Sequence, residues 1–309
     1  MEIKAFHDER TDTLTYVVFD PERKDAVVLD PVLDYEPVGS RIWTESVEAV
    51  ACFIQANALD VHFVLETHAH ADHLSGAQVM KDRFPKATLA IGERITKVQT
   101  IFKDIFALPD SFKTDGSQFD RLIREGEVLE AGRLRIEMFF TPGHTPACTT
   151  YKIGDALFTG DVLFMPDQGT GRCDFPGGST EDMWGSVTQR IYSFPPETRT
   201  FAGHDYQPGG RELAYESTVG EQMAKNVMCP AGISKKEFAA RRGERDGKLR
   251  APRLLYQSVQ VNIDAGALPP PEKNGRCYLR IPLNVMKGEA CPDTSGCGAS
   301  DRPSDSGQG

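Results

Sequence analysis

Hydrophobic and polar residues alternate along the first third of the chain in a pattern that predicts short strands and helices. Two β-rich runs, 16–19 and 26–29, lie on either side of a polar turn, and we expect them to form a hairpin. Apolar residues recur at helical spacing over 44–58, where Thr44 is a suitable helix cap. The apolar run 61–66 predicts a buried strand that ends directly before a cluster of histidine and aspartate residues.

The same alternation continues through the middle of the chain. A helix is expected over 74–84, followed by a strand over 88–91 and a further helix that ends near Phe106. A second β-rich stretch then begins, in which Gly154-Asp155 has the composition of a two-residue hairpin turn. The strands expected in this stretch and after it are 134–140, 149–153, 156–159 and 200–202.

The last third of the chain changes in character. A helix is predicted over 180–194, with Thr180 as its cap, and residues 211–245 also look helical. From about Gly288 onward almost no apolar residue remains, so this segment cannot offset the entropy cost of ordering. We therefore predict a core over 1–210, a helical and irregular extension over 211–287 packed on that core, and a disordered tail over 288–309.

Composition and charge narrow the class of protein. Hydrophobic residues make up 39% of the chain and charged residues 26%, which is typical of a globular protein. No apolar run reaches the roughly 18–20 residues that span a bilayer, and the first residues lack the layout of a secretion signal. We therefore expect a cytoplasmic protein without a membrane partner. The net charge of −10 argues against nucleic acid, because phosphate binding normally needs a basic face.

The segment 67–73, Thr-His-Ala-His-Ala-Asp-His, follows the predicted strand 61–66 and is the densest chemical feature of the chain. His68 and His70 are two residues apart, so they lie on the same side of an extended segment. Asp72 and His73 add a carboxylate and a third imidazole within the same six residues. Such a cluster indicates a metal site.

Three further side chains follow glycine at the end of predicted strands. His144 comes after Thr-Pro-Gly, Asp161 after Thr-Gly, and His204 after Gly203. Glycine lets the backbone turn sharply there and carry the next side chain toward a shared pocket. Each residue taken singly would more often be a structural hydrogen-bonding group. Together with the segment 67–73 they indicate a metal-dependent enzyme.

These motifs, His-x-His-x-Asp-His, Thr-Pro-Gly-His-Thr, Thr-Gly-Asp and Gly-His-Asp in this order, resemble those of the metallo-β-lactamase superfamily over roughly residues 10–210. The resemblance implies an α+β fold, namely a four-layer αββα sandwich with a metal site at the edge between two sheets. The fold by itself does not choose among the thioesterases, lactamases, nucleases and oxygenases of the superfamily.

Five segments are similar to the persulfide dioxygenase branch, the sulfur dioxygenases related to glyoxalase II. They are 66–73, 145–149, 169–175 (Gly-Thr-Gly-Arg-Cys-Asp-Phe), 258–262 (Ser-Val-Gln-Val-Asn) and 280–284. The resemblance implies one Fe(II) per chain, held by His68, His144 and Asp161, a set that leaves positions open for substrate sulfur and O₂. The implied reaction oxidises glutathione persulfide with O₂ to sulfite and glutathione. A homodimer is compatible with the resemblance.

The remaining ligand-type residues leave the metal count open. His70, Asp72, His73 and His204 either support the iron ligands or hold a second metal. In the second case two zinc ions bridged by Asp161 would make a glyoxalase II-like hydrolase that acts on a glutathione thioester. A non-catalytic sulfur or metal sensor on the same scaffold is a further alternative, whereas the acidic charge disfavours a nuclease. The catalytic candidates are Asp72, His73 and Arg172.

A basic stretch suggests how an anionic substrate is bound. Residues 234–253 contain eight lysines and arginines against three acids, although a solvated helix face would explain most of them. Arg172 lies beside the predicted site, where the alternative role is an ion pair with Asp174. The candidate substrate-binding residues are Arg172, Lys248, Arg250 and Arg253.

Overall fold

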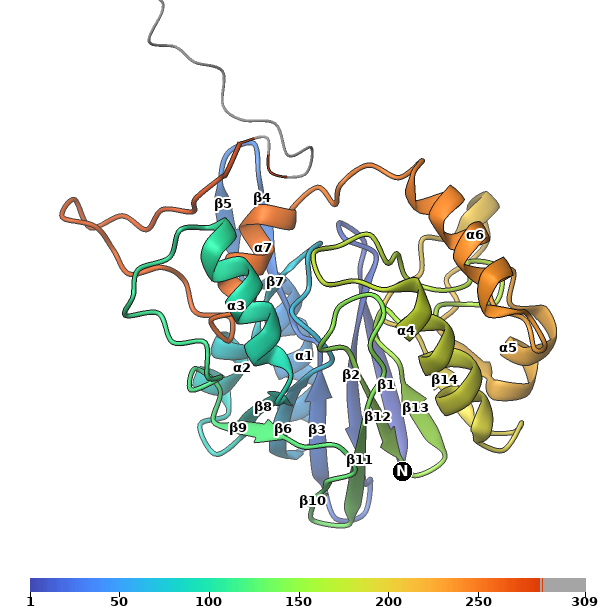
Figure 1. Ribbon diagram of the computed structural model, residues 1–309. Coiled ribbons are helices and arrows are strands. Elements are labelled where there is room, and N and C mark those ends of the chain that lie inside the picture. Colours follow the sequence, from blue (N-terminus) through green and yellow to red (C-terminus); the bar gives the residue numbers. More distant parts are fainter. Residues whose placement is uncertain (284, 286–309) are drawn as a thin grey trace, which may run out of the picture.

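Two six-stranded sheets form the centre of the molecule in the computed structural model, which describes residues 1–283 and 285 (Figure 1). Helices cover the outer face of each sheet, so the predicted four-layer αββα sandwich is confirmed. The predicted disordered tail, 288–309, lies outside the described residues. Among the described residues no helix is both long and apolar enough to cross a bilayer.

The first sheet has the order β1-β2-β3-β6-β8-β9. The predicted hairpin is present as the antiparallel pair β2 and β3, whereas β3, β6, β8 and β9 run parallel to one another. Parallel neighbours require crossover connections, and α1, α2 and α3 lie in these connections. The strands are β1 (Glu2–Asp8), β2 (Thr13–Phe19), β3 (Asp25–Leu29), β6 (Asp60–Glu66), β8 (Thr88–Gly92) and β9 (Arg121–Ile123).

The second sheet has the order β10-β11-β12-β13-β14-β15 and is antiparallel except between β13 and β14. The predicted turn at Gly154-Asp155 joins β12 to β13, and the φ angle of +59° at Gly154 is one that glycine adopts readily. The strands are β10 (Val128–Ala131), β11 (Leu134–Phe140), β12 (Thr149–Ile153), β13 (Ala156–Phe158), β14 (Arg199–Phe201) and β15 (Glu216–Thr218).

Seven α-helices surround the sheets in the described part of the chain. In Figure 1 the helices α1, α2, α3 and α7 lie on the side of the first sheet, and α4, α5 and α6 on the side of the second. Small strands, β4 (Val32–Glu36), β5 (Arg41–Trp43) and β7 (Leu74–Ser75), form a third sheet. The helices are α1 (Glu45–Ala56), α2 (Ala77–Arg83), α3 (Ile95–Ile105), α4 (Thr180–Gly185), α5 (Val219–Lys225), α6 (Lys235–Asp246) and α7 (Leu255–Asn262).

The core is split into layers by the alternation of side chains along the strands. On β2, Tyr16 and Val18 point into the apolar layer between the two sheets, where Met138 of β11 also lies. Val17, from the other face of the same strand, packs in the layer beneath the helices, together with Val259 of α7. Successive side chains of a strand point to opposite faces, so one apolar strand serves two layers. The ligand-bearing loops leave from the ends of these buried strands.

Several local expectations were wrong. The helix expected from residue 74 begins at Ala77, because Leu74–Ser75 instead form β7, which pairs with β4. Thr180 is not the cap of α4: the Ser179 hydroxyl accepts the Asp182 backbone N–H at 3.1 Å. Thr44 occupies the cap position of α1 without a side-chain hydrogen bond.

The segment after residue 210 also differs from its sequence pattern. The helical expectation for 211–245 is confirmed by α5 and α6, but it fails over 211–218, where irregular chain leads into β15. β15 pairs with β14 and supplies hydrogen-bond partners to that edge. A three-residue strand is too short to leave a recognisable period in the sequence. The later part of the extension contains a further helix, α7, whose Leu255 and Val259 are buried beneath the first sheet.

Candidate metal centre

The ligand-type residues of the second sheet lie close together because the strands before them run in the same direction. β11, β13 and β14 run the same way, since β11 and β13 are each antiparallel to β12, and β14 is parallel to β13. His144, Asp161 and His204 follow their C-terminal ends and therefore lie at one edge. The end of β6 joins this edge, because the Thr149 backbone N–H donates to the Thr67 carbonyl at 2.9 Å.

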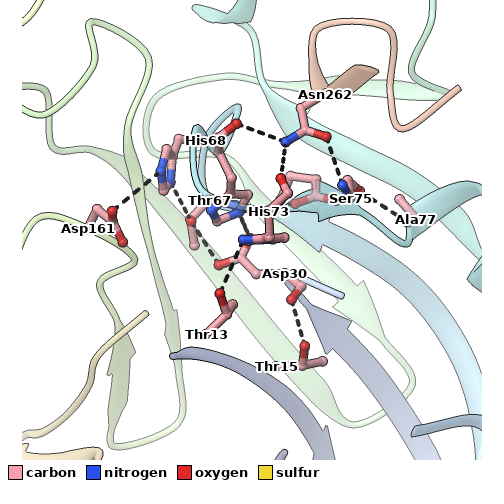
Figure 2. Close-up of polar contacts among 12 residues, drawn as sticks. Thr13, Thr15, Asp30, Thr67, His68, His73, Ser75, Ala77, Asp161 and Asn262 are labelled. Carbon is pink, nitrogen blue, oxygen red and sulfur yellow. Dashed lines mark hydrogen bonds and ion pairs between the residues drawn. The ribbon is translucent and has the colours of Figure 1, made fainter. Parts of the chain in front are cut away.

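His68, His144 and Asp161 form the first group of side chains, in which one ligand atom of each lies within 4.8 Å of the others. The Asp161 Oδ2 atom is 3.9 Å from His68 Nε2 and 3.6 Å from His144 Nε2. All three residues are buried. Figure 2 shows His68 and Asp161 facing each other from different parts of the fold.

The hydrogen bonds of the first group fix which nitrogen of each imidazole is free. The Thr67 hydroxyl donates its only proton to Asp30 Oδ2 at 2.8 Å, so it accepts a hydrogen bond from His68 Nδ1 at 3.0 Å. His144 Nδ1 donates to the Arg172 backbone carbonyl at 2.9 Å. In both histidines the lone pair of Nε2 is therefore available on the side of Asp161, as metal binding requires.

His70, Asp72, His73 and His204 form the second group, which also offers one ligand atom each within 4.8 Å. Asp72 Oδ2 lies 3.2 Å from His73 Nδ1 and 3.3 Å from His204 Nε2. Asp161 Oδ1 is also 3.3 Å from His204 Nε2. Asp161 therefore directs one oxygen toward each group, which is the position of a bridging carboxylate.

Two buried carboxylates that the sequence analysis did not identify hold His70. The Nε2 atom of His70 lies 3.0 Å from Asp30 Oδ1 and 3.4 Å from Glu66 Oε2. Burial raises the pKa of Glu66 to about 7. Both residues stand at the C-terminal ends of adjacent parallel strands, Asp30 directly after β3 and Glu66 as the last residue of β6. Their shared position at the ends of predicted strands is the feature of the sequence that could have identified them.

Burial and charge separate the two groups electrostatically. Burial lowers the pKa of His68 and of His144, which favours neutral imidazoles in the first group. In the second group burial also opposes the charge on His204, but the carboxylates of Asp72 and Asp161 outweigh it and raise the pKa. Burial likewise opposes ionisation of Asp72, yet His204 and His73 hold the pKa of that carboxyl well below its usual range.

The buried side chains fit a divalent metal. Several buried atoms at this edge have no hydrogen-bond partner within the described chain, and leaving such a group unpaired typically costs about 1–3 kcal/mol. Imidazole nitrogens and carboxylate oxygens are ligands for iron and zinc, and a bound cation would satisfy them. Those atoms are His68 Nε2, His73 Nε2, His204 Nε2 and Asp161 Oδ1.

A cavity of about 900 Å³ opens onto the metal-binding edge, and Asp72, His144 and Asp161 are among its lining residues. Arg172 and Arg253 also line the cavity. Arg172 forms the alternative ion pair as well, since its Nε and Nη2 atoms donate to the two Asp174 oxygens at 2.6 and 2.7 Å. The Arg172 guanidinium is thus already paired with Asp174, whereas the described residues form no ion pair with Arg253.

The other candidate substrate-binding residues do not line this cavity. Lys248 is exposed and pairs with Glu244 at 2.6 Å, and the Arg250 backbone carbonyl accepts from Arg172 Nη1 at 2.7 Å. Much of the basic stretch is occupied by ion pairs of this kind. Its most buried member, Arg242, pairs with Asp246.

The cavity wall also includes residues that the sequence analysis did not identify. Arg10, Arg242 and Arg245 also line the wall, and Phe164, Phe175 and Tyr206 give it an aromatic surface. The Tyr206 ring stacks on that of His204, with centroids 5.5 Å apart. Tyr206 lies two residues after His204 in the sequence. This closeness to a ligand-type residue is the feature of the sequence that could have identified it. Cys173, the residue after Arg172, is buried and free.

Comparison with known proteins agrees with the motifs and the fold. Residues 9–204 match the model of the metallo-beta-lactamase superfamily. A beta-lactamase hydrolase-like protein of Xylella fastidiosa is 45% identical over 93% of this chain, which spans 66% of that protein's length. The mitochondrial persulfide dioxygenase ETHE1 of Bos taurus is 27% identical over 87% of this chain and 90% of its own.

A solved structure with the same arrangement is that of ETHE1 from Myxococcus xanthus. It superposes with a TM-score of 0.69 at 26% identity and covers 86% of this chain and 100% of its own. The family match covers the loops that carry both groups of ligand-type residues, from the segment 67–73 to His204. The chain therefore belongs to the metallo-beta-lactamase superfamily.

Proposed function

We propose that this protein is a persulfide dioxygenase that oxidises glutathione persulfide with O₂ to sulfite and glutathione at one non-haem iron. The main support is the first group, His68, His144 and Asp161. Two neutral imidazoles and one carboxylate converge there, a ligand set used by Fe(II) oxygenases. The likeness to the persulfide dioxygenase of Bos taurus adds support.

Fe(II) held by this group would supply positions for the persulfide sulfur and for O₂. The chain's own residues prepare those positions. The Thr67 hydroxyl and the Arg172 carbonyl hold His68 and His144 with Nε2 toward Asp161. The reaction balances as one persulfide, one O₂ and one water giving sulfite, glutathione and two protons.

The cavity wall suits a peptide thiol that carries carboxylates. Arg172, Arg253 and Arg10 are among its lining residues. Guanidinium groups bind carboxylates through paired hydrogen bonds. We infer that one or more of these arginines binds the glutathione carboxylates while the persulfide reaches the metal.

A second candidate function is a two-zinc hydrolase of glutathione thioesters. The observation that favours it is the second group, His70, Asp72, His73 and His204, together with the bridging position of Asp161. The Xylella fastidiosa relative, which is 45% identical, has a name of the hydrolase kind. Two metals at this edge would present a bound hydroxide to a thioester carbonyl.

One experiment separates the two functions. The protein is purified without added metal, its metal content is measured, and O₂ uptake is followed with glutathione persulfide. The dioxygenase proposal expects about one iron per chain and O₂ consumption that matches sulfite formation. Zinc at about two per chain, hydrolysis of lactoylglutathione and no O₂ uptake would overturn it.

A further inference from the structure

We propose that Asn262, the last residue of α7, is a positioning residue of the metal centre. Its side-chain amide holds the loop that carries His70, Asp72 and His73 in its ligand-presenting conformation. The inference rests on the metal site of the proposed function and holds equally for the dioxygenase and the hydrolase. It makes the C-terminal extension part of the metal site.

The contacts of the Asn262 amide use both of its protons and its oxygen. Nδ2 donates to the backbone carbonyls of His70 at 2.9 Å and of His73 at 2.8 Å. Oδ1 accepts the Ser75 backbone N–H at 2.8 Å. Figure 2 shows the Asn262 side chain reaching the loop on the side away from Asp161. The side chain thus ties two carbonyls of the loop 67–73 to the adjoining strand β7.

The loop needs such a partner because its backbone is irregular. No helix or strand covers residues 67–73, so their buried carbonyls are not paired by regular secondary structure. The far end of the loop is tied back to β6, because the Ser75 hydroxyl donates to Glu66 Oε1. Asn262 therefore holds the second half of the loop, from His70 to the start of β7. Loss of its donors would leave two buried carbonyls to find new partners.

The position of Asn262 is fixed independently of the metal-binding loop. Leu255 and Val259 of α7 are buried in the layer beneath the first sheet. Just beyond the helix, the Gln99 side chain donates to the Ile263 carbonyl at 2.9 Å, and Gln78 donates to the Ala265 carbonyl at 2.9 Å. α7 is thus held by α2 and α3, and it can impose a geometry on the loop.

The amide does not serve its own helix. None of its three hydrogen bonds goes to α7, and all three cross to a segment nearly two hundred residues earlier, 192 in the case of His70. Asn262 itself is only 4% exposed. A leucine has the same branched arrangement of side-chain heavy atoms and would itself bury no polar group. The amide is therefore explained by the loop it contacts.

Gln260 provides a matched control on the same helix. It is 7% exposed, and its amide also binds backbone, donating to the carbonyls of Tyr256 and Arg280 and accepting the Arg280 N–H. None of these partners belongs to the metal-binding loop. Each of the variants Asn262→Leu and Gln260→Leu therefore removes one buried amide from α7. Only Asn262→Leu also loses hydrogen bonds to the backbone of the loop that carries His70 and His73.

The test measures metal binding rather than turnover. Apo-protein is titrated with Zn(II) against a competing chelator, and the visible spectrum is recorded with Co(II). We expect Asn262→Leu to weaken Zn(II) binding by about 10–100-fold and to change the Co(II) spectrum. Gln260→Leu should leave both close to wild type, although the melting temperature of both apo-variants falls. Unchanged Zn(II) affinity in Asn262→Leu, or an equal loss in Gln260→Leu, would overturn the inference.

Asn262→Asp keeps the test decisive if the leucine variant fails to fold. Aspartate has nearly the same volume and still accepts the Ser75 N–H, but it loses both donors to the loop carbonyls. We expect its Zn(II) affinity to fall by about tenfold or more. Wild-type affinity in Asn262→Asp would show that the two donated hydrogen bonds do not position the ligands. A wild-type protein that binds metal but takes up no O₂ would refute only the dioxygenase proposal.

Discussion

The two groups of ligand-type side chains meet at Asp161 but are assembled in different ways. His68, His144 and Asp161 come from three separate loops, so they converge only when both sheets are packed. Three of the four residues in the second group come from a single loop, and only His204 arrives from elsewhere. The first group is a product of the tertiary fold, whereas the second is mainly a property of a short segment.

The groups differ equally in how their charges are balanced. In the first, each histidine has a neutral partner at Nδ1, the Thr67 hydroxyl or the Arg172 carbonyl. In the second, the Asp72 carboxylate lies 3.2 Å from His73 Nδ1 and 3.3 Å from His204 Nε2. A metal bound by Nε2 of His68 and His144 would leave their Nδ1 hydrogen bonds in place. A metal bound by His204 Nε2 would replace the contact of that atom with Asp72.

The largest expected effect is that of Asp161→Ala. This substitution removes the only carboxylate of the first group and one oxygen contact of His204. We expect iron affinity to fall by more than the roughly 10–100-fold typical of losing an outer partner. Metal analysis after gel filtration measures the loss, and a variant that retains a full iron complement would contradict the role of Asp161.

A smaller effect is expected from Asp72→Ala. If one iron is held by the first group, this change removes an ion-pair partner of His204 and reduces iron affinity by less than about tenfold. The same metal analysis applies. Loss as complete as that in Asp161→Ala would instead indicate a dinuclear centre and would favour the hydrolase.

The smallest expected effect concerns how the free energy of unfolding depends on pH in His144→Gln and His204→Gln. It is measured by chemical denaturation of metal-free protein. The folded pKa of His144 is lowered below 6.5, chiefly by burial, so the wild type loses stability as pH falls below that value. The folded pKa of His204 is raised above 6.5 by Asp72 and Asp161 against the effect of burial. Its stabilising contribution is therefore complete below 6.5 and is lost as pH rises through the folded value.

The two variants should therefore depart from wild type in opposite directions. On acidification from about pH 8 to about pH 5.5, His144→Gln should lose less stability than wild type, and His204→Gln should lose more. Each difference is limited to about 1.4 kcal/mol per pH unit and per proton. If the stability of both variants departed from wild type in the same direction on acidification, the opposite pKa shifts of His144 and His204 would be contradicted.

The individual strands and the cluster of ligand types were predicted well because both are local signals, whereas the four-layer sandwich followed from the resemblance to the superfamily. Alternating apolar runs located the hairpin of β2 and β3 and the strand β6. Cap assignments were less secure, since Ser179 and Thr180 are adjacent residues of the same type and only the backbone geometry decides between them. α7 was not recognised because its apolar residues face a layer built from distant strands.

The motif 67–73 by itself determined where the ligand-type side chains are concentrated, because four of them fall within six residues. Only the tertiary structure decided which of these side chains lie close enough together to share a metal. Asp161 stands between two groups because β11, β13 and β14 run in one direction, and Asp30, Glu66 and Asn262 hold the loop from segments that are remote in sequence. Those residues carry no local pattern, since their roles come from hydrogen bonds that exist only after the sheets and α7 are packed.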